Sequence, residues 1–135
     1  MKQKENLKQL LLKDLSSRLP YGVVVNYNGI ARPLFGIEPT QHFQITLDNA
    51  LDGEHNGLVY VSLDVDGEEP KPYLRPLSSM TEEEKLMYEG LMIGTDNISY
   101  MLDVIDWLYE HHFDVRNLIE KDLAIEVTEE NNPYK

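Results

Sequence analysis

The 135-residue sequence contains no cysteine. This absence excludes disulfides, zinc-thiolate sites and thiol nucleophiles, and it is typical of proteins that work in a reducing cytoplasm. A chain of this length buries about two-thirds of its unfolded surface, so it needs neither a disulfide nor a metal ion to fold as one domain. We therefore expect one cytoplasmic domain that spans residues 1–135.

Long apolar runs are also missing. No stretch approaches the roughly 20 apolar residues that a membrane-spanning helix requires. Near the amino end, the run Leu10–Leu12 stops at Lys13, whereas a secretory signal needs about 7–15 apolar residues. Hydrophobic residues still make up 41% of the chain, which is typical of a globular protein. We expect no contact with a membrane.

Positive charge is scarce outside the first 20 residues. The chain has a net charge of -12, and residues 1–20 carry +3, which leaves -15 for the other 115 residues. Such a body repels phosphate backbones, so direct binding of nucleic acid is not expected. The acidic surface either serves solubility or meets a basic protein partner, for example by imitating nucleic acid.

The first half of the sequence predicts one helix and then short strands. Leucines at helical spacing predict an amphipathic helix from about Lys4 to Ser17, which lays these leucines on a sheet. Its polar side carries Lys8, Gln9, Lys13 and Asp14. Asn28-Gly29 predicts a type I′ hairpin turn, and Pro33 places the returning strand at an edge or a bulge. The expected strands are Gly22–Tyr27, Ile30–Ile37, His42–Leu47 and Leu58–Leu63.

Pro70–Lys85 joins the strand-rich half to a helical half. Its prolines favour an extended backbone, and Thr81 with Glu84 predicts a capping box at the start of a helix. Within this joint, Tyr73, Leu74 and Arg75 fit two interpretations. In the first, Tyr73 and Leu74 are buried and Arg75 pairs with a carboxylate. In the second, the three residues form an interaction patch.

After the joint, the pattern is mostly helical. We predict helices over Thr81–Leu91 and over about Asn97–His112, the second capped by Asp96, and one more helical turn over Arg116–Lys121. A strand is expected within Leu123–Val127. The second helix has a wide apolar arc, which predicts that it is the main core element of this half. The arc comprises Ile98, Met101, Leu102, Ile105, Leu108 and Tyr109, flanked by Tyr100, Val104 and Trp107.

The expected fold class is α+β. An amino-terminal helix (residues 1–20) precedes a β half (21–69), the joint (70–80), a mainly helical half (81–127) and a polar tail (128–135). The sheet is expected to have four or five mainly antiparallel strands, either open or curled into a small barrel, and to pack against two or three helices of the second half.

Motifs that carry chemistry are few. The acidic segments starting at Asp48 and Asp64 fail the EF-hand spacing, and the sequence has no nucleophile elbow and no glycine-rich phosphate loop. His111-His112-x-Asp114 contains the only adjacent histidines, but neighbouring helical residues point about 100° apart. We therefore interpret the pair as partly cationic residues that stabilise a helix end. No catalytic, cofactor or metal residue is predicted.

The run Lys71–Glu84 (KPYLRPLSSMTEEE) resembles a segment of small uncharacterised proteins encoded by phages and integrated elements of Bacteroides-type bacteria. Arg18–Val23 and Asp106–Glu120 resemble other parts of the same group, and together the three stretches cover about a third of the chain. No activity or catalytic residue is carried over from this group. The resemblance implies an accessory protein of a mobile element that acts inside the bacterial cell.

Three functional hypotheses follow. The leading one is a non-enzymatic phage or prophage accessory protein that binds another protein. The second is a small hydrolase or nucleotide-processing enzyme that uses His111, His112 and Asp114 or the carboxylates of Asp64–Glu69, and it requires these side chains to line one pocket. The third is an acidic mimic of nucleic acid, with carboxylates in two rows at phosphate spacing. The sequence leaves the partner and the oligomeric state open.

Overall fold

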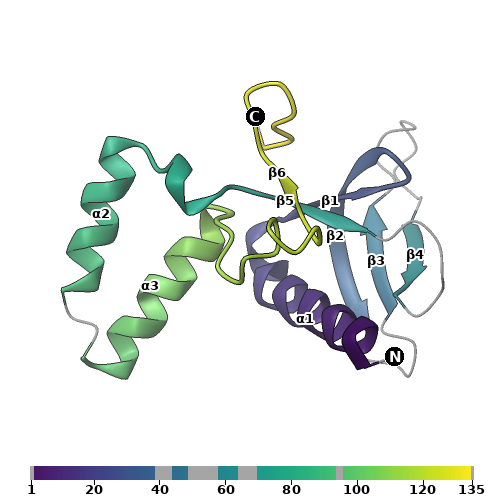
Figure 1. Cartoon of the computed structure of the whole chain (residues 1–135), viewed down its shortest axis with the longest axis horizontal. Helices are drawn as coiled ribbons and strands as arrows, with labels where there is room; N and C mark the ends of the chain where they lie inside the picture. Colours follow the sequence, from purple (N-terminus) through teal and green to yellow (C-terminus); the bar gives the residue numbers. More distant parts are fainter. Residues whose placement is uncertain (1, 39–43, 49–57, 64–69, 94–95, 135) are drawn as a thin grey trace.

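The structure is a computed structural model that describes residues 2–38, 44–48, 58–63, 70–93 and 96–134. It has the predicted α+β class, with a first helix, a sheet and two later helices. Figure 1 shows α1 (Lys2–Arg18) and the sheet on one side of the molecule, and the pair α2 (Glu82–Met92) and α3 (Ile98–Glu110) projecting from the other side.

The sheet has six strands in the order β4-β3-β2-β1-β5-β6. All neighbouring pairs are antiparallel except β5 and β6, which are parallel. Among the described strands β4 and β6 are the two edges, so the sheet is open and the barrel alternative is wrong. The strands are β1 (Val24–Tyr27), β2 (Ile30–Glu38), β3 (Gln44–Asp48), β4 (Leu58–Ser62), β5 (Lys71–Leu74) and β6 (Ile125–Glu126).

The hairpin between β1 and β2 has the predicted turn. Asn28 and Gly29 both have positive φ, 56° and 78°, as a type I′ turn requires. Pro33 lies in β2, which is an interior strand and not an edge. The register of β2 against β3 shifts between Leu34 and Gly36. The bulge alternative therefore describes this strand, because a residue without an N–H sits beside the irregularity.

Alternation along β3 and β4 sets the inner face of the sheet. Ile45 and Leu47 are fully buried, and Val61 and Leu63 nearly so, while Tyr60, between Val59 and Val61, is exposed. Thr46, on the other face of β3, is buried as well. The start of the predicted strand His42–Leu47 lies outside the described residues.

The joint contains a strand that the sequence analysis did not predict. β5 pairs with β1 through Lys71 and Pro72 and lies parallel to β6, so it is an interior strand. Prolines normally argue against such a position because they donate no hydrogen bond. Here their fixed φ keeps the segment extended, as predicted, and the extended segment also pairs.

The helix boundaries agree with their capping signals. The Thr81 hydroxyl accepts from the Glu84 N–H (3.1 Å), and the Glu84 carboxylate accepts from the Thr81 N–H (2.9 Å), which confirms the capping box. The cap of α3 is Asn97, whose side chain accepts from the Ser99 N–H, so the assignment of Asp96 as the cap is wrong.

The predicted helical turn over Arg116–Lys121 is reduced to one hydrogen bond at helical spacing, from the Lys121 N–H to the Asn117 carbonyl (3.3 Å), and no helix forms there. Asn117, within this stretch, and Asp122, just after it, have positive φ. The buried Asp114 carboxylate accepts from the backbone N–H groups of Leu118 and Ile119. An aspartate that satisfies backbone donors in this way favours a turn over a continuing helix.

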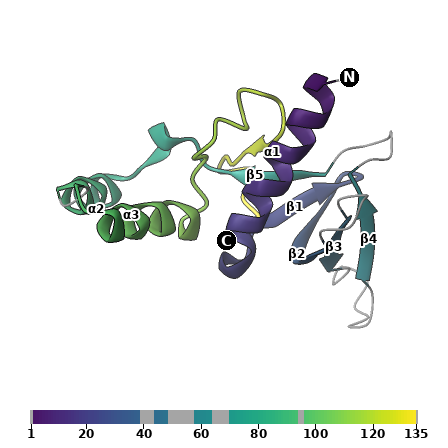
Figure 2. The ribbon, with the colours of Figure 1, turned by 90° about the horizontal axis from the view of Figure 1, so that it is seen from below.

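Two hydrophobic clusters organise the molecule. The larger lies between α1 and the sheet and includes the fully buried Leu15, Val23 and Leu74, and Figure 2 shows α1 crossing one face of the sheet. The smaller lies where the α2–α3 pair meets the body and consists of Val104, Leu108 and Phe113, with partly buried neighbours.

A buried ion pair connects these two regions. Asp14 and Arg18 are both fully buried, and Arg18 Nε lies 2.6 Å from Asp14 Oδ2. Arg18 also donates to the Phe113 carbonyl (2.7 Å), and its guanidinium lies 4.8 Å from the centre of the Tyr109 ring. The prediction of Asp14 on the solvated side of the helix is therefore wrong. The pair at i and i+4 lies on the face of α1 that meets α3.

Candidate functional site

The three residues of the predicted interaction patch are distributed between the interior and an ion pair. Leu74 is fully buried, and Tyr73 is 9% exposed and accepts a hydrogen bond from Asn26 through its hydroxyl. Arg75 holds Glu84 in a two-pronged pair with N–O distances of 2.7 and 2.8 Å. Through these contacts the segment joins β5 to β1 and to the start of α2.

The two adjacent histidines have different environments. His111 is the C-cap residue of α3; its Nδ1 lies 2.9 Å from the Trp107 carbonyl, and its ring is tilted by 35° against the Trp107 ring, with centres 4.5 Å apart. His112 has a φ of 64° and stacks on Tyr134, with ring centres 3.7 Å apart and planes 8° apart. The rings thus have separate partners, in line with the expected divergence.

Burial lowers the pKa of His112 to about 4. This ring is therefore neutral at pH 7, and the interpretation of both histidines as partly cationic helix-end residues is wrong for His112. His112, the residue after the C-cap of α3, contacts Tyr134 of the carboxyl-terminal tail. Tyr134 donates to the Tyr73 carbonyl (2.7 Å) and accepts from the Val24 N–H (3.1 Å), so its ring holds the tail against both His112 and the sheet.

The histidines line a polar concavity of about 770 Å³ between the start of α2, the end of α3 and the tail. Several of its polar groups are engaged, Arg75 and Thr81 with Glu84, and His111 with the Trp107 carbonyl. The buried Nδ1 of His112 has no hydrogen-bond partner among the described residues. Asp114 is not among the lining residues, because its carboxylate is used by the turn that follows it. We therefore assign no reaction to this concavity.

The pKa of His112 predicts a pH dependence of stability. Its folded-state pKa of about 4 lies below the ordinary 6.5, so between these values the unfolded chain binds more protons and the free energy of unfolding falls as pH drops from 6.5 to 4. In His112→Asn we expect this loss of unfolding free energy to be smaller by about 1 kcal/mol, because asparagine does not titrate. Asparagine tolerates the positive φ, and solvent screening of the partly exposed ring limits the size of the effect. Urea unfolding at several pH values measures it.

Glu84→Gln is the matched control for this experiment. Hydrogen bonding from Arg75 lowers the pKa of Glu84 from 4.5 to about 2, so Glu84 contributes stability above pH 4.5 that is lost as pH falls through the interval down to 2. The control should therefore keep the wild-type slope between pH 6.5 and 4.5. An unchanged slope in His112→Asn would contradict the burial of that imidazole.

Metal and membrane sites have no support in the part of the chain that the structure describes. Within it, no group of three or more histidine, aspartate or glutamate side chains is arranged to hold a metal ion, and no helix is both long and apolar enough to cross a bilayer. The candidate carboxylates between Asp64 and Glu69 lie outside the described residues, as do His42 and His55.

The most unusual surface is on the α2–α3 hairpin. None of the 11 residues of α2 is buried, and in α3 only Val104, Leu108 and Tyr109 are. The prediction that this helix is the main core element of the second half holds only for its last two turns, which supply Val104 and Leu108 to the smaller cluster. Large apolar side chains of the hairpin are exposed instead: Leu86, Met87, Met92, Ile93, Ile98, Tyr100, Met101 and Leu102.

One part of this surface continues an interface that the protein already makes. Ile98, Leu102, Ile105 and Tyr109 follow one face of α3 at intervals of four, three and four residues. Tyr109, at the inner end, is 4% exposed, whereas Leu102 is 55% exposed and Ile98, at the outer end, 76%. We call Ile98, Met101, Leu102 and Ile105 the outer α3 face.

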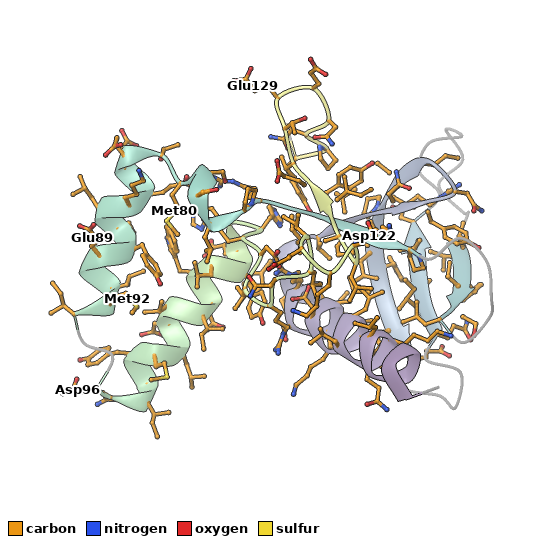
Figure 3. The ribbon with its side chains drawn as sticks, in the orientation of Figure 1. Met80, Glu89, Met92, Asp96, Asp122 and Glu129 are labelled. Carbon is orange, nitrogen blue, oxygen red and sulfur yellow. The ribbon has the colours of Figure 1, made fainter. Side chains whose placement is uncertain are left out.

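The charge around the hairpin is strongly negative. Residues 82–110 contain eight acidic side chains and a single basic one, Lys85. Figure 3 shows Glu89 on the outer side of α2 and Asp96 at the tip of the hairpin, both directed away from the rest of the molecule. The hairpin therefore combines exposed apolar side chains with an acidic border.

Comparisons with protein-family models, with curated proteins and with solved structures found no match to this chain.

Proposed function

We propose that this chain is a non-enzymatic accessory protein of a phage or prophage and that it acts by binding another protein through the α2–α3 hairpin. The observation that carries the proposal is the exposure of large apolar side chains on both helices of the hairpin. Keeping apolar surface in water costs about 25 cal/mol per Å². Apolar surface bordered by polar residues is typical of a protein–protein contact.

The chemistry of the hairpin supports a macromolecular partner over a small substrate. Sites for small molecules are concave and enclose their ligand, whereas these apolar side chains are exposed on a pair of helices that projects from the body (Figure 1). Three of the five methionines of the chain, Met87, Met92 and Met101, are among its exposed residues. Methionine side chains adapt readily to the shape of a bound surface.

The biological setting of the proposal comes from the sequence resemblance. Lys71–Glu84, the stretch that resembles proteins of phages and integrated elements, leads from β5 into the first turn of α2. A second such stretch, Asp106–Glu120, begins within α3. Both adjoin the hairpin, so the proposed partner is a protein of the bacterial cell that carries such an element.

The proposal predicts a partner whose capture depends on the hairpin. The wild-type chain and a hairpin variant, Leu86→Gln/Ile93→Gln/Ile98→Gln/Leu102→Gln, are each immobilised and exposed to lysate of a Bacteroides-type host. We expect the wild-type chain to retain one protein in stoichiometric amount, and the variant to lose at least nine-tenths of it. The same must hold for the purified partner, measured by titration. The four side chains are exposed, so the variant should stay folded.

Phe35→Gln/Tyr60→Gln is the control bait, because these two side chains are exposed on the sheet, at 64% and 60%. It should retain the partner as the wild-type chain does. Equal capture by all three baits would show that the hairpin is not the binding surface. Recovery of background proteins alone at low salt would count against a protein-binding function.

A further inference from the structure

We infer that the partner presents a basic amphipathic helix to the outer α3 face, made of Ile98, Met101, Leu102 and Ile105. The inference rests on the proposed function, since it names the chemistry of the partner that the hairpin binds. It draws on the continuity of this face with an internal helix contact, on the spacing of its apolar residues and on the charge around it.

The internal contact shows what kind of element this face accepts. At the inner end of the same face, Tyr109 packs against α1, the helix that carries Arg18. The Arg18 guanidinium lies 4.8 Å from the centre of the Tyr109 ring, a cation–π contact. The covered part of the face is thus occupied by an amphipathic helix whose arginine, paired with Asp14 of the same helix, lies at the contact. The face then continues uncovered beyond it, through Leu102 to Ile98.

The spacing of the residues on this face, of which Ile98 and Leu102 are exposed and Ile105 is half-buried, fits another helix. Ile98, Leu102 and Ile105 recur at i, i+4 and i+7, the pattern by which helices pack their side-chain ridges into each other's grooves. The stretch from Ile98 to Ile105 is about 10 Å long, or two helical turns. A partner helix of three to four turns covers it completely and still reaches the charged side chains around it.

The acidic side chains around this face favour a positively charged partner helix. Residues 82–110 contain eight acidic side chains and one basic one, and Glu84 among the acidic ones is paired with Arg75 of the joint. The remaining negative charge attracts lysine and arginine and repels an acidic segment, within a screening distance of about 10 Å at 0.1 M salt. The same charge opposes a second copy of this chain as the occupant, because two acidic hairpins would face each other. The basic helix of a second copy, α1, already has its leucines packed on its own sheet.

The test uses three synthetic 14-residue peptides and the full-length chain. One peptide places leucine at helical i, i+3 and i+4 spacing with lysine elsewhere; the second has the same pattern with glutamate in place of lysine; the third is a scramble of the leucine–lysine composition. Fluorescence anisotropy of labelled peptides measures the dissociation constants. We expect the amphipathic lysine peptide to bind at least tenfold tighter than either of the others.

Matched variants locate the contact. Ile98→Gln/Leu102→Gln keeps the charge of the chain and should weaken binding of the lysine peptide at least tenfold, whereas Leu86→Gln/Ile93→Gln, on α2, should change it less than twofold. Glu89→Gln/Asp103→Asn removes two exposed charges and should weaken binding severalfold at low salt and less at high salt.

Several results would overturn the inference. Equal binding of the scrambled peptide would mean attraction by charge alone, and insensitivity to Ile98→Gln/Leu102→Gln would mean another site. A dimer in sedimentation experiments that these two substitutions abolish would identify a second copy as the occupant. If the glutamate peptide binds best while the capture experiment still depends on the hairpin, the proposed function stands and the basic helix is wrong. If capture fails as well, the proposed function fails with it.

Discussion

Replacing Arg18 by methionine is expected to lower the free energy of unfolding by about 3–5 kcal/mol. The substitution fills much of the same volume, so the loss reflects charge and hydrogen bonding. Asp14 is fully buried and has Arg18 as its nearest cation, at 2.6 Å, with Arg116 Nε at 3.7 Å. Without Arg18, the Asp14 carboxylate keeps its desolvation cost and the Phe113 carbonyl loses a donor. Urea unfolding at pH 7 measures the difference.

The pH dependence of this variant tests the same explanation. Burial already raises the pKa of Asp14 in the wild-type chain, and the Arg18 guanidinium opposes that rise. In Arg18→Met the pKa of Asp14 should rise further, so the folded state binds a proton more strongly than the unfolded state. Stability is then regained as pH falls from that raised pKa towards 3.8. The deficit relative to the wild-type chain should therefore shrink at acidic pH.

Two further variants separate a buried charge from a generic helix defect. Lys13→Met removes an exposed cation from the same helix and should change stability by no more than about 0.5 kcal/mol. Asp14→Leu/Arg18→Met removes both charges and should be more stable than Arg18→Met alone. If the double variant is the less stable of the two, an unpaired carboxylate is not the cause of the loss.

Local signals predicted the local parts of this fold correctly. Asn28-Gly29 specifies its turn because both residues tolerate positive φ, and Thr81 with Glu84 specifies a helix start because each satisfies a backbone donor of the other. The alternation that buries Ile45 and Leu47 is equally local. These features depend on residues within a few positions of each other, and a single sequence displays such relations directly.

The errors come from partners that are distant in the sequence. From the sequence pattern alone, Asp14 is predicted on the solvated side of its helix. In the structure it is buried beside Arg18, which also donates to the carbonyl of Phe113, 95 residues further along the chain. Pro72 argues against an interior strand, yet β5 lies between β1 and β6. Apolar periodicity shows that a side chain prefers burial, but it does not show which surface provides it.

The candidate site illustrates that last limit. The periodicity that predicted a core helix over about Asn97–His112 is present, but Ile98 and Leu102 extend past the body, where the described elements leave them uncovered. A pattern of hydrophobic residues is the same whether the chain covers it or leaves it for a partner. The two cases differ in whether other helices or strands lie close enough to cover the apolar residues, and only the folded structure shows this.

Truncating Phe113 to alanine is expected to cost about 3–5 kcal/mol, through lost burial and a cavity that the surroundings fill only in part. Phe113 is fully buried in the smaller cluster, with the Arg75 guanidinium 4.2 Å from its ring centre and the Trp107 ring 5.8 Å away. Its neighbours His112 and Asp114 hydrogen-bond to the backbone of Arg75. The ring therefore fixes the hairpin to the sheet, so its loss should also change the environment of Trp107, the single tryptophan.

Chemical unfolding followed by Trp107 fluorescence and by far-ultraviolet circular dichroism measures both effects. Phe35→Ala is the matched control: the same substitution at a side chain that is 64% exposed should cost less than about 1 kcal/mol. Phe113→Leu should lie between the two, because it keeps most of the apolar volume but loses the flat contacts to Arg75 and Trp107. If Phe113→Ala is as stable as Phe35→Ala, the hairpin does not depend on this ring for its attachment.

A fluorescence transition that precedes the dichroism transition in Phe113→Ala would show instead that the hairpin detaches before the sheet unfolds. This is the order expected of an element held by one small cluster.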